Sequence, residues 1–232
     1  VLVAGPETGG TGTGFFVGPD LVVTNQHEVE AAAAGGAVLV VNHALGSARP
    51  AEVIASAGPL EATGEDYALL RVEGAASPFF VLRDSEETLR LQNVIAAGYP
   101  GIVLETDANF RALRSGDMTA VPDVTVTDGI VNVEQNIGPR ARAIIHTARI
   151  SGGNSGGPLV DTCGRVVEVN TFGRSEERTN RHLNFSLAST DLLRFLEAAG
   201  VETRRSAEPC VPQERPAAAP PRAAAAPPGG GE

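Results

Sequence analysis

Short apolar runs separated by turn residues dominate the chain. Phe15–Val17 and Leu21–Val23 flank Gly18-Pro19-Asp20, whose turn chemistry predicts a β-hairpin. Glycine and proline punctuate the remaining runs at short intervals, which indicates an all-β sandwich or barrel. These further predicted strands lie at 37–41, 67–72, 94–97, 124–126, 130–133, 143–145, 159–160 and 165–171.

Helical periodicity is sparse. Residues 28–34 could form a short helix, and 189–199 predict a better one, with Thr190 as its cap and Gly200 at its end. The apolar face of this C-terminal helix would consist of Leu192, Leu193, Phe195 and Leu196.

The composition changes near the C-terminus. Residues 206–232 contain seven of the 16 prolines, two alanine runs and a glycine run. Such a segment has too few large apolar side chains to offset chain entropy, so we expect a disordered tail. The expected folded domain is therefore 1–205.

Composition and charge exclude several functions. Hydrophobic residues make up 42% of the 232, and no apolar run is long enough to predict a transmembrane segment. The net charge of −10 argues against nucleic acid as a partner. All 18 basic residues are arginine, which excludes Schiff-base lysine, P-loop and Ser–Lys chemistry. A lysine-free chain rich in Arg, Ala, Gly and Pro is typical of a GC-rich bacterial genome.

The chain has two cysteines, Cys163 and Cys210. Two thiols cannot make a structural zinc site, and their spacing is not that of a redox motif. They predict one disulfide, because Cys210 lies in a proline-rich segment with little else to hold it; the alternative is two separate buried thiols. A disulfide implies an oxidising compartment, so we expect a secreted or periplasmic protein whose signal peptide is not visible here.

The strongest chemical signal is the segment from Gly152 to Pro158, which reads GGNSGGP. A nucleophilic serine needs an exposed Oγ, and backbone N–H groups turned toward one point. Flanking glycines permit both, so Ser155 is a candidate nucleophile and the N–H groups of Gly153 and Ser155 a candidate oxyanion hole. The alternative is a glycine-rich surface loop.

Two further residues complete a candidate triad. His27 follows a predicted strand, and an imidazole can take and return the serine proton. Asp66 opens another predicted strand and could fix the tautomer of that histidine. Each alone has an ordinary structural interpretation, which we accept for the remaining histidines, His43, His146 and His182.

The motifs around these residues resemble those of trypsin-like serine proteases, especially the bacterial Deg/HtrA branch. They read TNQH up to His27, DYALL from Asp66 and GNSGGPL around Ser155. The resemblance spans about 10–199 and implies two six-stranded antiparallel β-barrels packed around a cleft, with a C-terminal helix. We expect the barrels to meet near 110–120, with His27 and Asp66 on the first and Ser155 on the second.

One position separates this chain from pancreatic-type trypsins, and two depart from the family pattern. Asn154 stands where pancreatic-type trypsins carry aspartate, an asparagine that the Deg/HtrA branch shares, so activation by a newly cut N-terminus is not expected. Glu28 and Glu168 stand where the family usually has an apolar residue and a glycine, and a buried unpaired carboxylate is costly. The 33 residues after Ala199 (200–232) are too few for a PDZ domain.

The resulting prediction is a serine endopeptidase that cleaves proteins or peptides through an acyl-enzyme. It needs no metal and no organic cofactor, and the sequence makes no prediction about oligomeric state. The first alternative is a catalytically silent binding module on the same fold. A sandwich or carbohydrate-binding domain of unrelated fold would leave the three motifs unexplained.

Substrate preference is predicted from the resemblance. Arg149, six residues before Ser155, would lie at the base of the primary specificity pocket, with Asn170 and Thr171 also binding substrate. A guanidinium there would favour acidic side chains. If Arg149 instead turns to solvent or pairs with Glu168, a shallow pocket would favour small apolar residues. Both alternatives predict poor cleavage after lysine and arginine.

Overall fold

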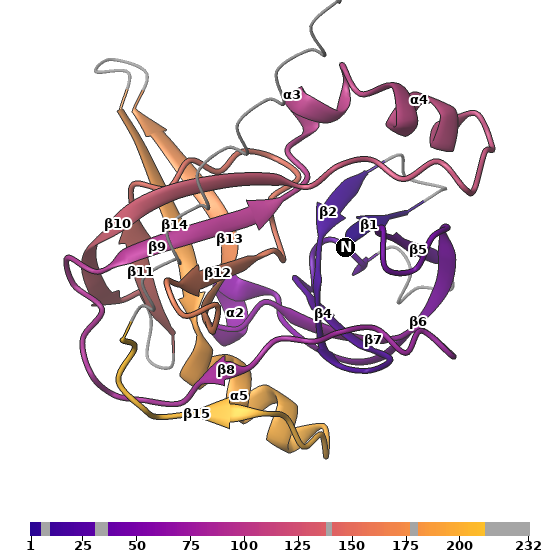
Figure 1. Ribbon diagram of the computed structural model, residues 1–232. Helices are drawn as coiled ribbons and strands as arrows, with labels where there is room; N and C mark the ends of the chain where they lie inside the picture. The colour runs from indigo at the N-terminus through magenta and orange to yellow at the C-terminus, as the bar shows by residue number, and fades with distance from the viewer. Residues whose placement is uncertain (6–9, 31–36, 138–140, 177–180, 212–232) are drawn as a thin grey trace, which may run out of the picture.

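The N-terminal strands roll into one barrel-like sheet. The computed structural model describes the chain except residues 6–9, 31–36, 138–140, 177–180 and 212–232, and it describes 172–176 and 181–182 by their backbone alone. The strand order of this sheet is β2-β1-β5-β6-β7-β4-β3 (Figure 1, indigo to purple). Its strands are β1 (Leu2–Ala4), β2 (Thr11–Thr13), β3 (Phe15–Gly18), β4 (Leu21–Thr24), β5 (Val38–Val41), β6 (Arg49–Ala57) and β7 (Tyr67–Arg71).

The remaining strands form a second sheet. Strand β12 pairs with both β9 and β13, which closes the six strands β9-β10-β11-β14-β13-β12 into a barrel. The short β8 and β15 extend the sheet beyond β13 through parallel pairing. The strands are β8 (Leu82–Arg83), β9 (Asn93–Gly98), β10 (Thr125–Asn136), β11 (Arg142–His146), β12 (Pro158–Asp161), β13 (Val166–Glu176), β14 (Arg181–Ala188) and β15 (Arg205–Ser206).

The expected two-barrel, all-β fold with a C-terminal helix is confirmed, with one barrel closed and the other nearly closed. The expected boundary near 110–120 is wrong, because β9 already pairs with β10 and β12. The change of sheet therefore falls between Arg71 and Leu82. The predicted strands at 124–126 and 130–133 form one continuous strand, β10.

An apolar cluster joins the two barrels. Phe15, Val23 and Leu69 of the first barrel pack in the same cluster as Val169 and Leu187 of the second. Shared burial of apolar side chains stabilises the relative position of the barrels in proportion to the apolar area that their contact removes from water. The interface thus positions the loops that both barrels contribute to the site.

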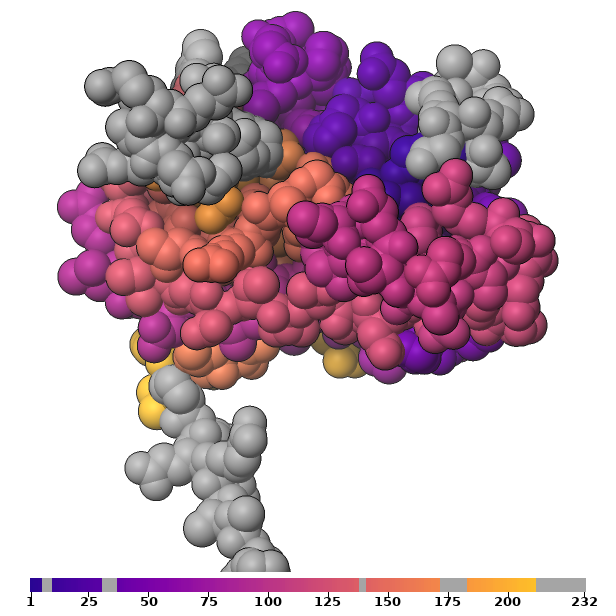
Figure 2. All heavy atoms as spheres, turned by 90° about the horizontal axis from the view of Figure 1, so that it is seen from above, coloured from indigo at the N-terminus to yellow at the C-terminus, as the bar shows by residue number. Residues whose placement is uncertain are grey.

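Among the described residues, four helices connect or flank the sheets: α2 (Leu60–Thr63), α3 (Gly101–Leu104), α4 (Ala108–Arg114) and α5 (Ser189–Ala198). The α3–α4 segment, between β9 and β10, spreads over the face seen from above, beside residues of the second barrel (Figure 2, magenta). Asp107 caps α4 by accepting a hydrogen bond from the backbone N–H of Phe110. No helix within the described ranges is long and apolar enough to cross a membrane.

Helix α5 lies where it was predicted but begins differently. Its N-cap is Ala188, with no side-chain cap, and Thr190 lies within the helix, so the predicted cap is wrong. The Ser189 hydroxyl instead donates to the carbonyl of Arg83. Gly200, with φ of 72°, follows the helix as expected for a residue that terminates it. The other predicted helix, at 28–34, falls mostly outside the described residues.

The two cysteines are joined. Cys163, in the turn between β12 and β13, is bonded to Cys210, which follows β15. Arg165 adds a hydrogen bond to the carbonyl of Glu208 and an ion pair to Asp161 at 2.8 Å. The segment after α5 is therefore held to the second barrel by a covalent bond, an arginine and the pairing of β15 with β8.

Candidate active site

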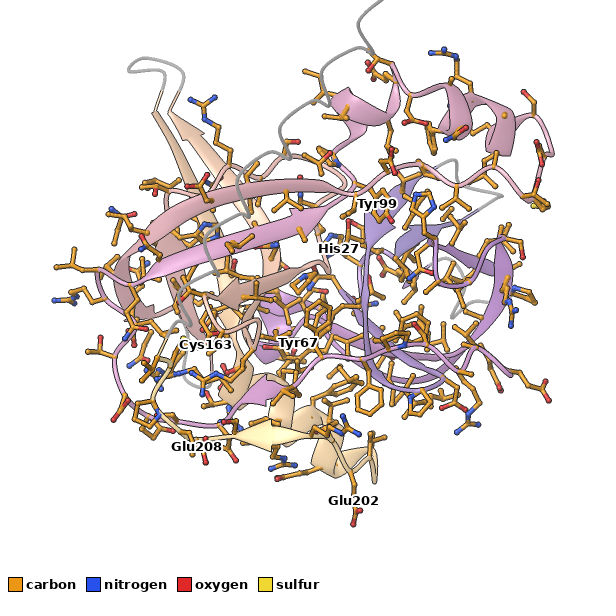
Figure 3. The ribbon with its side chains drawn as sticks, in the orientation of Figure 1. His27, Tyr67, Tyr99, Cys163, Glu202 and Glu208 are labelled. Carbon is orange, nitrogen blue, oxygen red and sulfur yellow. A yellow bond between two sulfur atoms is a disulfide. The ribbon has the colours of Figure 1, made fainter. Side chains whose placement is uncertain are left out.

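Strand register brings His27 and Asp66 together. Strands β4 and β7 are antiparallel with Thr24 opposite Ala68, so the residues just beyond this pair face one another. The Asp66 carboxylate accepts from the His27 backbone N–H at 3.1 Å and lies 2.7 Å from ring Nδ1. Asp66 is buried, whereas the His27 side chain is 45% exposed. His27 lies where the two barrels meet (Figure 3).

Asn25 stabilises the position of Asp66 through a hydrogen bond to its backbone. Its side-chain amide donates to the backbone carbonyl of Asp66 at 2.7 Å, and Asn25 itself is completely buried. Because a buried amide that lost this acceptor would cost free energy, the bond fixes the strand end that carries Asp66.

Ser155 lies in a loop whose backbone conformation requires glycine at two positions. The Asn154 N–H donates to the carbonyl of Ser151 at 3.0 Å, and Gly153 has φ of 95°, as the third residue of a type II turn requires. Gly156 also has positive φ, at 81°. A Cβ on Gly153 would overlap the Tyr99 carbonyl, so the close approach as well as the backbone conformation requires glycine there.

The N–H groups of Gly153 and Ser155, on either side of Asn154, remain available. Those of Asn154, Gly156 and Gly157 donate to carbonyls of the protein. In the part of the chain that the structure describes, the N–H groups of Gly153 and Ser155 have no acceptor. These are the two N–H groups predicted to form an oxyanion hole.

The serine and the histidine are not in contact with each other. The Ser155 hydroxyl donates to the carbonyl of Thr171 at 3.0 Å, and no hydrogen bond links it to His27 within the described residues. Ring Nε2 of His27 instead lies 3.1 Å from a carboxylate oxygen of Glu28. Partial burial lowers the pKa of His27, but hydrogen bonds and charges from Asp66 and Glu28 outweigh burial and raise that pKa from 6.5 to about 10.

Thr13 braces the serine loop from the other barrel, and sequence reasoning missed it. Its N–H donates to the carbonyl of Ser155 at 2.8 Å, and its hydroxyl donates to the carbonyl of Gly153 at 2.6 Å. The same hydroxyl accepts from the N–H of Tyr99 at 3.0 Å. A threonine between glycines gives no local signal for such a role, because its partners lie far along the chain.

The three predicted substrate-binding residues have different surroundings. Arg149 is exposed, and its backbone carbonyl accepts from Thr127. Asn170 is buried and fully engaged, since its side chain donates to the carbonyl of Pro158 and accepts from the Ser186 hydroxyl. Thr171 supplies the carbonyl that accepts from Ser155. The structure thus brings Asn170 and Thr171 under the serine loop.

Glu168 lies apart from Arg149, so the expected alternative of an ion pair between them is wrong. Glu168 is buried in a small pocket that Arg83, Arg142 and Glu134 also line. One of its carboxylate oxygens has no hydrogen-bond partner among the described residues. Burial, and then the nearby charges of Asp191 and Glu134, raise the pKa of Glu168 well above its usual range.

The other histidines have separate surroundings. His43 lies 2.8 Å from Asp123 on the surface, and the His146 ring is buried with Nε2 on the Ser186 hydroxyl. Burial lowers the pKa of His146 to about 4, so this imidazole is neutral at pH 7. The side chain of His182 falls outside the described part of the chain.

Two β-barrels that bring a histidine–aspartate pair of one barrel to a serine loop of the other define a chymotrypsin-like fold. The model of the trypsin-like peptidase domain matches residues 12–167, and the chain belongs to this family.

Relatives and solved structures that the chain resembles are also named as proteases. The chain is 30% identical over 176 residues to a putative serine protease, HhoB, of Synechocystis, covering 74% of this chain and 36% of HhoB. It resembles the inactive form of the Rv3671c protease of M. tuberculosis, with a TM-score of 0.62, 24% identity, and coverage of 86% and 88% of the two chains. A serine endoprotease from Yersinia pestis gives a TM-score of 0.60 at 21% identity, covering 82% and 57%. The chain spans 29% to 38% of the length of the curated relatives it matches.

Proposed function

We propose that this protein is a serine endopeptidase in which Ser155 is the nucleophile, His27 the general base and Asp66 the residue that orients the histidine. The observation that carries the proposal is the bidentate contact of the Asp66 carboxylate with His27, together with a serine loop in which the N–H groups of Gly153 and Ser155 have no acceptor among the described residues. Family membership supports the same assignment.

The chemistry follows from these positions. The Ser155 oxygen bonds to the carbonyl carbon of the substrate as its proton passes to Nε2 of His27. The N–H groups of Gly153 and Ser155 stabilise the negative charge that develops on the carbonyl oxygen. The C–N bond then breaks, and Nε2 returns the proton to the leaving amine.

A water molecule completes the cycle. It attacks the ester carbonyl of the acyl-enzyme while its proton passes to Nε2, and the Ser155 oxygen leaves and regains the proton. Side chains and backbone N–H groups of the protein supply every proton transfer and every stabilising hydrogen bond in this scheme.

Substrates and location are part of the proposal. The net charge of −10 disfavours nucleic acid and is compatible with protein or peptide substrates. The disulfide between Cys163 and Cys210 supports an oxidising location, secreted or periplasmic.

Hydrolysis of a mixed peptide library by the wild type and by Ser155→Ala tests the proposal. We expect the variant to lose at least about three orders of magnitude in kcat. The matched control is Ser85→Ala, which removes a hydroxyl whose hydrogen-bond partner among the described residues is the N–H of Glu87 and not a residue of the serine loop. Equal hydrolysis by the wild type and Ser155→Ala would reject Ser155 as the nucleophile.

The second candidate is a catalytically silent binding module on the same fold. The hydrogen bond of Ser155 to Thr171 and the contact of His27 with Glu28 favour it, because they separate the nucleophile from its base. Peptide binding without turnover at any pH from 6 to 11 would establish this alternative.

A further inference from the structure

The Glu28 carboxylate contacts Nε2 of His27, the nitrogen that would accept the serine proton in catalysis. Its Oε1 lies 3.1 Å from Nε2 of His27, while Nδ1 of the same ring lies 2.7 Å from Asp66. A carboxylate only accepts hydrogen bonds, so a ring held between two carboxylates carries a proton on both nitrogens. An imidazolium has no lone pair at Nε2 with which to take the serine proton.

The Ser155 hydroxyl is likewise directed away from His27. Its proton points to the carbonyl of Thr171, with the oxygens 3.0 Å apart. The Ser155 hydroxyl and His27 Nε2, between which the proton would pass, are therefore each bonded to another group. Together the contacts with Thr171 and Glu28 define one resting arrangement. For Ser155 to attack, its proton must turn from Thr171 to Nε2, and that nitrogen must first be released.

The first barrel provides room for Glu28 in this position. A Cβ on Gly12, in β2, would lie 2.5 Å from the Glu28 carboxyl carbon and 2.6 Å from Oε2. The Glu28 side chain is only 14% exposed, whereas that of His27 is 45% exposed. Glu28 thus packs over a glycine of β2 while the imidazole stays open to an approaching substrate.

We propose that Glu28 is an internal gate of the active site: its carboxylate occupies His27 Nε2 at rest and must leave before Ser155 can be activated. The inference rests on the proposed function of these residues. Glu28 is a positioning residue in this account, because it acts through His27 and not on the substrate.

This gate predicts that activity depends on pH through the ionisation of His27. Asp66, which immediately precedes β7, and Glu28, from the histidine's own segment, are the charged groups that act on His27 within the described residues. Burial lowers the pKa of His27, yet these two carboxylates raise it to about 10. Activity that needs neutral His27 should therefore rise with pH well above neutrality, and removing one carboxylate should move that rise to lower pH.

Glu28→Ala and Glu28→Gln test the gate, with Glu30→Gln as the matched control. Glu30 is an exposed carboxylate two residues further along the same segment. The rate of covalent reaction with a fluorophosphonate probe is measured from pH 6 to 11. We expect Glu28→Ala to react at least about tenfold faster than the wild type at pH 7, since one unit of pKa on the acid limb is tenfold in rate. Glu30→Gln should follow the wild-type profile.

Histidine titration by NMR gives a readout that does not need activity. In the Ser155→Ala background, adding Glu28→Gln should lower the pKa of His27 by at least about one unit. Identical pH–rate profiles for the wild type and Glu28→Ala would overturn the gate, as would a slower reaction of Glu28→Ala at every pH. Absence of reaction at Ser155 in all variants at all pH values is a different result, which would reject the proposed function itself.

Discussion

The Asp66 carboxylate holds His27 at two points, the backbone N–H at 3.1 Å and ring Nδ1 at 2.7 Å. One bond fixes the main chain where β4 ends, and the other fixes the rotation and tautomer of the ring. A buried aspartate thus supports the proposed base both mechanically and electrostatically.

Asp66→Asn should therefore be severely impaired. An amide can donate to Nδ1 and so hold the wrong tautomer, which we expect to lower kcat by about three to four orders of magnitude at pH 7. Asp84→Asn is the matched control, because Asp84 lies 3.9 Å from Arg205 and has no contact with His27. Full activity of Asp66→Asn in a steady-state assay would transfer the orienting role to another acid.

The disulfide should contribute measurably to stability. The bridge closes a loop of 47 residues, for which the chain-entropy model gives about 4 kcal/mol. Cys163→Ser/Cys210→Ser should therefore have a lower melting temperature than the wild type. Truncation after Val211 should leave the melting temperature unchanged, whereas truncation before Cys210 should lower it. Two alkylatable thiols in the native, air-exposed protein would contradict the bridge.

Glu168 should make stability depend on pH. Burial raises the pKa of Glu168 in the folded state, so between its ordinary pKa near 4.5 and the raised value the folded protein binds a proton that the unfolded chain has lost. This group therefore lowers the free energy of unfolding as pH rises above about 4.5, by at most about 1.4 kcal/mol per pH unit.

Glu168→Gln removes that ionisation with little change of shape. We expect the variant to be more stable than the wild type at pH 8 and to have a shallower dependence on pH, as measured by urea unfolding from pH 5 to 9. Glu52→Gln, at an exposed position of β6, is the matched control and should parallel the wild type. Parallel curves for Glu168→Gln and the wild type would show that the carboxyl does not titrate differently on folding.

Much of the fold could be predicted from apolar runs, because strands such as β4 and β7 are continuous stretches of buried side chains. Strand β14 was missed because it buries Asn184 and Ser186, whose hydrogen bonds with His146, Ala148 and Asn170 satisfy them. Such polar residues interrupt the apolar pattern, and their partners lie elsewhere in the chain.

Part of the candidate site could also be predicted from the sequence. His27, Asp66 and Ser155 carry local motifs, so their sequence neighbourhoods made them candidates. Thr13 does not, since the carbonyl it binds belongs to Gly153, 140 residues away. Glu28 stood out as unusual, but its contact with Nε2 of His27 depends on side-chain directions that sequence spacing does not encode.

We propose that substrate preference depends on Arg149, whose side chain is exposed. We expect poor cleavage after lysine and arginine in a peptide library, whether the pocket favours acidic or small apolar residues. If the guanidinium binds acidic side chains, Arg149→Ala should lose cleavage after them, whereas Arg90→Ala, at another exposed arginine, should not. Dominant cleavage after basic residues would contradict both preferences, and unchanged specificity in Arg149→Ala would place Arg149 outside the pocket.

The central claim is that Ser155 is an activated nucleophile. Its most direct test is the reaction of the native protein with a fluorophosphonate from pH 7 to 10, followed by mass spectrometry of the labelled peptide. The account predicts one adduct, on Ser155, which disappears in Ser155→Ala and is strongly slowed in His27→Ala. An unlabelled Ser155 throughout this range, or equal labelling with His27 removed, would contradict it.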